Sequence, residues 1–172
     1  MLFRDLLLSV LSFSAVALPV LPATSAELPK QGACKVSSKL EGKLDLDKSS
    51  SVGSNGIESW GETATITVDC GQTQWPAIKE ERCFGFDELI GVLRFSTGYC
   101  LDTDADGDRV LWKLVPSKRG KNSAMSSDSS EVLMASGKYQ GMSGKSTYRC
   151  GYSGSEAEWT GLCDGEMTFK FP

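Results

Sequence analysis

The chain has 172 residues, a formal net charge of −4, six cysteines and no histidine. This mildly acidic balance argues against a nucleic-acid partner, because nucleic-acid binding needs a basic surface. Without histidine, the usual base for a serine or cysteine nucleophile is missing, and a histidine-containing zinc site is excluded.

Residues 1–26 have the pattern of a signal peptide. Arg4 precedes an apolar run over residues 6–21, and Thr24-Ser25-Ala26 places small residues at the −3 and −1 positions of a cleavage site. The run is too short and too interrupted by proline to favour a membrane anchor. We therefore expect cleavage, no membrane insertion afterwards, and a secreted or periplasmic protein whose residues 27–172 form a single domain.

All six cysteines lie after the predicted cleavage site, and an even number in an exported chain favours three disulfides. Many connectivities are open to six cysteines. One pair lies symmetrically about the predicted polar turn 153–156, a second flanks the predicted turn at Asp87-Glu88, and the third follows by elimination. The predicted pairs are Cys34–Cys70, Cys83–Cys100 and Cys150–Cys163.

The N-terminal part predicts one weak and one strong strand. Residues 34–46 alternate weakly between apolar and polar side chains, and residues 48–56 have the composition of a loop. From Trp60 to Cys70, aliphatic residues at even positions alternate with threonines, the period of a half-buried strand.

The middle of the chain predicts a loop with one helical turn over residues 72–82 and then three strands. Two of them, 82–86 and 91–104, are separated by a turn at Asp87-Glu88, and the third covers 109–115. In 91–104, the odd-numbered residues from Leu93 onwards are the more apolar set, so we expect that set to face the core.

The C-terminal part predicts a polar loop over residues 116–130, with a solvated basic cluster at 118–121, and three further strands. These strands cover 132–135, 145–152 and 158–171, the last with a break near Asp164-Gly165. About eight short strands and no convincing amphipathic helix indicate an all-β antiparallel barrel or sandwich.

The segment Ser136-Gly137-Lys138-Tyr139-Gln140-Gly141-Met142-Ser143-Gly144, followed by a strand, resembles the GTGxFxxxxG segment of allene oxide cyclase and dirigent barrels and of related exported bacterial proteins. Ser136 stands where threonine is usual, and Met142-Ser143 stands where dirigent proteins tend to have Ala-Arg. The resemblance implies an antiparallel up-and-down barrel of about eight strands and assigns no catalytic residue. The glycines suit a tight bend, and Tyr139 is expected to be a buried plug.

A barrel of this size is either filled by side chains or holds one small molecule. We expect an exported, non-catalytic protein that binds a small ligand or a protein partner; a cyclase or isomerase inside the barrel is the enzymatic alternative. The aromatic residues expected to line such an interior are Phe95, Tyr99, Trp112, Tyr139, Tyr148 and Phe169.

Four alternating aspartates allow two interpretations. Asp102, Asp104, Asp106 and Asp108 match the start of an EF-hand calcium loop, but Lys113 occupies the twelfth position, where a bidentate glutamate is needed. The alternative is a β-hairpin with a two-residue type I′ turn at Asp106-Gly107. That hairpin pairs Tyr99 with Leu114, Leu101 with Trp112, Thr103 with Val110, and Asp104 with Arg109. We favour the hairpin and expect no cofactor, with calcium as the possible exception. A calcium-dependent structural or adhesion module is accordingly a further alternative function to test.

Overall fold

The computed structural model describes residues 28–172, so the predicted signal peptide lies outside the described residues. Nearly all of the described chain is extended, and one 3-10 turn, η1 (Gly137–Tyr139), interrupts the strands. The strands are β1 (Gln31–Val52), β2 (Asn55–Asp69), β3 (Ile78–Ile90), β4 (Leu93–Asp104), β5 (Arg109–Leu114), β6 (Ser117–Gly120), β7 (Met125–Ala135), β8 (Ser143–Gly154) and β9 (Glu158–Lys170).

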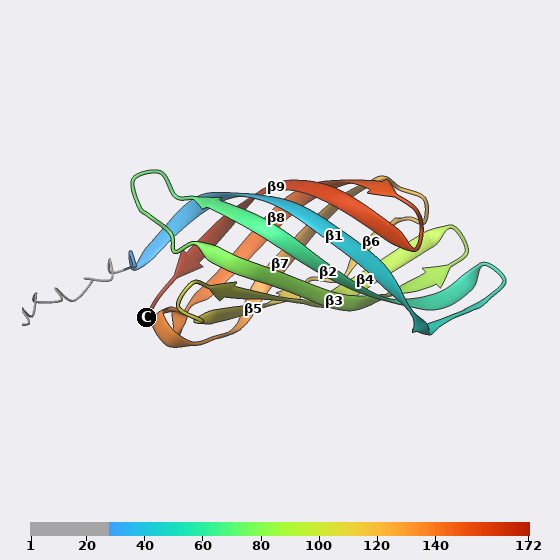
Figure 1. The fold of residues 1–172 in the computed structure, drawn as a ribbon, viewed down its shortest axis with the longest axis horizontal. Helices are drawn as coiled ribbons and strands as arrows, with labels where there is room; N and C mark the ends of the chain where they lie inside the picture. The colour runs from blue at the N-terminus through green and yellow to red at the C-terminus, as the bar shows by residue number, and fades with distance from the viewer. Residues whose placement is uncertain (1–27) are drawn as a thin grey trace, which may run out of the picture.

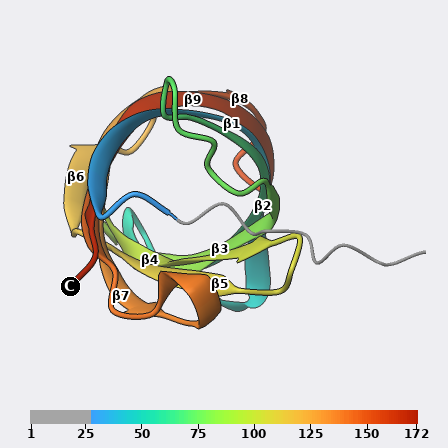
Figure 2. The same ribbon diagram turned by 90° about the vertical axis from the view of Figure 1, so that its left-hand side faces the viewer.

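The sheet closes into an antiparallel barrel of eight strands, as the end view shows (Figure 2). Successive strands pair with one another around the ring, and β1 pairs with β9 to close it. β5 and β6 both pair with β4 and together make one broken strand. Pro116 lies at the break, where its missing N–H cannot continue the ladder. The predicted all-β up-and-down barrel is therefore confirmed.

The three predicted disulfides are present. Cys83 faces Cys100 across β3 and β4, and Cys150 faces Cys163 across β8 and β9, with Cα–Cα distances of 4.0 and 4.1 Å. The third disulfide joins Cys34 of β1 to Cys70 at the end of β2. Each disulfide therefore joins antiparallel neighbours in the ring.

Several predicted loops are strands. β1 and β2 continue through residues 48–56 and turn at Gly53, whose φ is +62°, so that this hairpin projects from the barrel (Figure 1). β3 begins at Ile78, inside the predicted loop 72–82, and β7 begins at Met125, inside the predicted loop 116–130. Polar residues are accepted in these strands because at least one side of each strand meets solvent.

Two predicted turns are also wrong. Asp87-Glu88 lies within β3, and the chain reverses instead after Ile90, where Gly91 has a φ of +61°. β9 runs without the predicted break through Asp164-Gly165, because both residues keep their pairs with β1 and β8.

The central hairpin differs from the prediction by one residue. Gly107 has a φ of +87° and its N–H donates to the carbonyl of Asp104 at 3.2 Å, while the Asp104 N–H donates to the carbonyl of Asp108. This is a three-residue loop with glycine in the left-handed region, in place of a type I′ turn. The pairs are consequently Tyr99–Lys113, Cys100–Trp112, Leu101–Leu111, Asp102–Val110 and Thr103–Arg109.

A shift of one residue exchanges the two faces of a strand. Gly98, Cys100, Asp102 and Asp104 of β4 are buried, and the odd-numbered residues expected to face the core are only partly buried. The predicted core face of this strand is therefore wrong.

The strand directions place the connections in two groups at opposite ends of the barrel (Figure 1). At the plug end, where η1 and the β2–β3 and β4–β5 connections lie, Trp75 packs on Tyr139 and Phe169 with ring centroids 5.7 and 4.8 Å apart. Tyr139 is 1% exposed, which confirms its expected role as a plug. We call the opposite end, with the β6–β7 and β8–β9 connections, the mouth. Among residues 28–172, no helix has the length and apolar character needed to cross a membrane.

Candidate ligand-binding site

The barrel encloses a cavity of about 480 Å³, which is within the usual size range of small-molecule sites. It extends from Trp75 of the plug to residues 121–124 and 153–156 of the mouth. The interior is hollow because several inward positions carry small side chains in place of large aliphatic ones. These positions include Ser38, Ser96, Ser130 and Ser146.

Large aromatic side chains form much of the wall, and glycines paired with them on the adjacent strands leave room for their rings. A Cβ atom on Gly85 would lie 2.5 Å from the indole of Trp60, and one on Gly42 would lie 2.3 Å from the indole of Trp159. The indoles therefore lie flat against the sheet. The aromatic lining residues are Trp60, Trp75, Trp112, Tyr148, Tyr152 and Trp159.

Three of these tryptophans each donate a hydrogen bond to an interior carboxylate. Trp60 Nε1 donates to Asp87 Oδ1 at 3.0 Å. Trp112 Nε1 donates to Asp102 Oδ2 at 2.8 Å, and Trp159 Nε1 donates to Glu62 Oε1 at 2.7 Å. These bonds satisfy the indole N–H groups and hold the carboxylates in one orientation.

Glu81 and Asp102 form an acidic pair in the middle of the cavity. They are register partners on β3 and β4, and both line the interior. Burial, reinforced by the charge of Asp102, raises the pKa of Glu81 well above its usual range. Burial also raises the pKa of Asp102, against hydrogen bonds from Glu81 and Trp112 that favour its charged form. The pair therefore retains a shared proton at a pH where exposed carboxyls have lost theirs.

Two further groups near this pair have raised pKa values. Burial raises the pKa of Glu62, although the hydrogen bond from Trp159 opposes the shift. Burial also raises the pKa of the Tyr148 hydroxyl, so that it remains a hydrogen-bond donor. The centre of the cavity thus presents acids and donors to whatever occupies it.

Cationic side chains lie nearer the mouth and already have partners. Arg94 bridges two acids, with Nη1 2.7 Å from Asp87 Oδ2 and Nη2 2.9 Å from Glu58 Oε2. The guanidinium of Arg119 lies over the ring of Tyr152 at 5.4 Å. Within residues 28–172, no basic side chain forms a hydrogen bond or an ion pair with Glu81 or Asp102.

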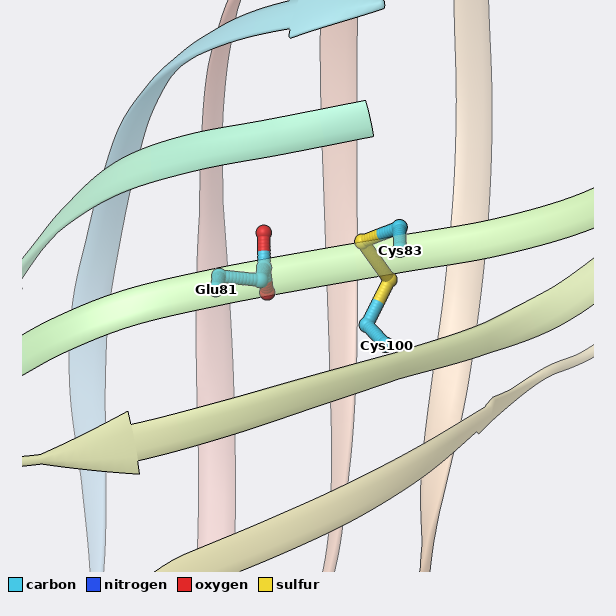
Figure 3. Close-up of side chains that lie close together, drawn as sticks. All are labelled: Glu81, Cys83 and Cys100. Carbon is cyan, nitrogen blue, oxygen red and sulfur yellow. A yellow bond between two sulfur atoms is a disulfide. The ribbon is translucent and has the colours of Figure 1, made fainter. Parts of the chain in front are cut away.

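Glu81 also lies close to the Cys83–Cys100 disulfide (Figure 3). A carboxylate with two cysteine sulfurs has the donor types of a metal site, but these sulfurs are bonded to each other. Metal binding by cysteine requires the thiolate. The grouping is therefore a carboxyl beside a structural disulfide.

The structure brings two of the six expected lining residues, Trp112 and Tyr148, to the cavity wall. Tyr139 and Phe169 belong to the plug and are buried in the apolar cluster there. Phe95 and Tyr99 lie on the outer side of β4, where Tyr99 contacts Phe84 with ring centroids 5.7 Å apart. Phe95 and Tyr99 lie outside the cavity because the one-residue shift in hairpin register exchanges the two faces of β4.

The sequence prediction missed three of the four lining indoles, and Asp102 was the one lining carboxyl among its candidate site residues. A usable signal was present for Trp60 and Glu62, because both continue the even-numbered alternation of Ala64 and Ile66 in the best-predicted strand. Glu81 carried no such signal, since its segment has the composition of a charged loop.

The four aspartates of the β4–β5 region do not share one centre. Asp102 points into the cavity, whereas Asp104, Asp106 and Asp108 surround the ammonium group of Lys138. Although burial alone would raise it, hydrogen bonds from Lys138 and Tyr139 hold the pKa of Asp104 below its usual range. Hydrogen bonds to Asp106 and to Asp104 raise the pKa of Lys138. A lysine thus occupies the position between three of the proposed calcium ligands.

Comparison with known proteins identifies the fold alone. No protein-family model matches this sequence, and no curated protein matches it. The structure of a pterocarpan synthase dirigent protein superposes with a TM-score of 0.51 at 6% sequence identity, covering 92% of this chain and 100% of that one. The chain therefore has a dirigent-like barrel fold, consistent with the resemblance of residues 136–144.

Proposed function

We propose that this chain is an exported protein that binds a small organic ligand inside its barrel, with entry through the mouth. The observation that carries the proposal is the cavity of about 480 Å³, whose aromatic walls hold oriented carboxylates at its centre. A few convergent polar groups within an otherwise apolar wall are typical of small-molecule sites. A barrel with a structural role alone would gain stability from a filled interior.

The three disulfides support an oxidising location outside the cytoplasm. We accordingly propose that the protein is secreted or periplasmic, with residues 1–26 as the signal peptide. N-terminal sequencing of the exported protein tests this, and a mature chain that begins at residue 27 is the expected result.

Binding in the cavity is tested by titration with the neutral dye N-phenyl-1-naphthylamine. The variant Ser130→Phe fills the cavity from β7, and Ser127→Phe adds the same side chain to the exposed side of that strand. We expect saturable binding to the wild type and to Ser127→Phe, and none to Ser130→Phe. Equal binding by both variants would place the dye outside the cavity and remove the proposal.

One observation favours a cyclase or isomerase as the second candidate. A protonated carboxyl next to a carboxylate, as in the Glu81–Asp102 pair, provides both a general acid and a general base. Mass spectrometry of co-purifying molecules and of their products after incubation separates the two functions. Conversion that Glu81→Gln abolishes would favour the enzyme, and recovery of unchanged ligand would favour binding.

A further inference from the structure

One oxygen of the central acidic pair depends on the neighbouring carboxyl for a hydrogen bond. Asp102 is 9% exposed, and its Oδ2 accepts the indole N–H of Trp112, but Oδ1 has no donor in the described chain apart from the Glu81 carboxyl. The neighbouring Glu81 can satisfy this oxygen while it keeps its proton. A buried carboxylate oxygen facing a cavity requires a hydrogen-bond donor, and a positively charged donor satisfies it best.

The charges of the cavity lining favour a cation. Six acidic side chains line it against three basic ones, and the basic ones lie toward the mouth. Among them, Arg94 is already paired with Asp87 and Glu58. The acidic lining residues are Glu62, Glu81, Asp87, Asp102, Asp128 and Glu156, and the basic ones are Arg94, Arg119 and Lys121.

The aromatic walls suit the same ligand. Trp112 and Tyr148 line the cavity together with the acidic pair, and Trp60 and Trp159 extend the aromatic wall toward the mouth. Aromatic faces attract cations and also pack against an apolar body. Carboxylates and indoles around one space therefore favour an amphipathic organic cation over a neutral or anionic molecule of similar size.

From this arrangement we infer that the ligand of the cavity is an organic amine, bound as its ammonium ion, whose N–H groups take the place of the proton between Glu81 and Asp102. The inference rests on the proposed binding function and names its ligand class. The exchange balances: the ammonium enters with its charge, the O–H bond of the Glu81 carboxyl breaks, and one proton leaves to solvent. Both carboxylates then accept hydrogen bonds from the ammonium.

The exchange predicts that amine affinity rises with pH until the pair has lost its proton. Other titratable groups that face the pair are acids or phenols, namely Glu62 on β2, Asp128 on β7 and Tyr148 on β8. The basic lining residues lie toward the mouth. No interior base is therefore expected to reverse the direction of this dependence.

The experiment compares three probes that differ in their head group: 2-phenylethylamine, 2-phenylethanol and 3-phenylpropanoate. Binding is measured by tryptophan fluorescence and by calorimetry in buffers of different ionisation enthalpy, between pH 5.5 and 8. We expect the amine to bind at least about tenfold more tightly than the alcohol at pH 8, the carboxylate to bind least, and about one proton to be released per amine bound.

Glu81→Gln should abolish the proton release and flatten the pH dependence. Glu88→Gln, a change on the exposed side of the same strand, should leave both unchanged. Melting temperatures of the two variants verify that they fold.

The ligand inference and the binding function fail in distinguishable ways. Equal binding of amine and alcohol, or amine binding without proton release, overturns the cation inference while leaving a ligand-binding barrel. If none of the three probes binds while the naphthylamine dye still does, the cation inference is again overturned and the ligand-binding barrel remains. Failure of the dye as well overturns the binding function itself.

Discussion

The Nζ atom of Lys138 lies 2.9 Å from Oδ2 of Asp104 and ties η1 to the β4–β5 turn at the plug end of the barrel. Asp104 is 1% exposed and also accepts hydrogen bonds from the Tyr139 hydroxyl and from the backbone N–H groups of Asp106 and Asp108. The aspartates that resemble a calcium loop in the sequence are therefore neutralised by Lys138 at the plug end of the barrel.

Calcium should leave the melting temperature of the wild type unchanged, because the ammonium group already neutralises the three converging aspartates. Lys138→Met should destabilise the fold by about 3 kcal/mol, since it leaves a buried carboxylate without its cation. In this variant, calcium should recover part of the loss. Lys145→Met, which removes an exposed pair with Glu131, is the control and should cost little. A calcium-dependent rise in the wild type would favour a calcium module instead.

The stability of the wild type should fall as pH rises from the ordinary carboxyl range through the raised pKa values of Glu81 and Asp102. Within that window the folded state binds more protons than the unfolded state, so each increase in pH favours unfolding. Urea unfolding between pH 5 and 8.5 measures the effect.

In Glu81→Gln this decline should be smaller, and the variant should be the more stable protein at the upper end of the range. Glu88→Gln should follow the wild-type curve. Parallel curves for Glu81→Gln and the wild type would show that the pair ionises normally. At lower pH, Asp104 has the opposite effect on stability. Because its pKa is lowered in the folded state, its charged form stabilises the fold, and that stability is lost as the pH falls and Asp104 becomes protonated.

Gly85→Ala should destabilise the barrel by about 2 kcal/mol, because the added methyl group would overlap the carbonyl of Thr97 and the indole of Trp60. The displaced indole would also weaken its bond to Asp87, which should be visible as a change in tryptophan fluorescence. Gly61→Ala is the matched control on β2, where the nearest atom to an added Cβ is 3.9 Å away. Equal unfolding midpoints for the two variants would contradict this packing.

Replacing both Cys150 and Cys163 by alanine should lower the free energy of unfolding by about 3 kcal/mol, through the greater freedom of the unfolded chain and the loss of a buried cross-strand contact. Denaturant unfolding without reductant measures this loss. A change below about 0.5 kcal/mol would mean that the strand pairs on either side hold this register without the covalent bond.

Local patterns of the chain predicted the fold class well. The alternation in Trp60–Cys70, the even cysteine count and the glycine-rich segment 136–144 were enough for an all-β barrel with the correct disulfide pairs. Those features depend on short-range geometry or on symmetry about a turn. The Cys83–Cys100 prediction required only a chain reversal somewhere between the two cysteines, and the actual reversal at Gly91-Val92 lies midway between them.

The site was much less predictable. Lys79–Arg82 has the composition of a loop, yet Glu81 lies inside the barrel because β3 pairs with both β2 and β4. Phe95 and Tyr99 were expected to line the interior and lie outside it, since the side chains of a strand exchange faces when its register moves by one residue.

The sequence by itself determined that the chain forms antiparallel strands joined by disulfides, because period-two patterning and cysteine spacing act locally. Tertiary structure alone decided which residues share the cavity. Gly107 selects a three-residue turn and turns Asp102 inward, and the register of β3 with β4 then places it beside Glu81, where it accepts a hydrogen bond from the indole of Trp112. Strand register and barrel closure depend on all the strands together. The sequence pattern of one strand therefore cannot predict that two acidic residues from different strands will lie side by side.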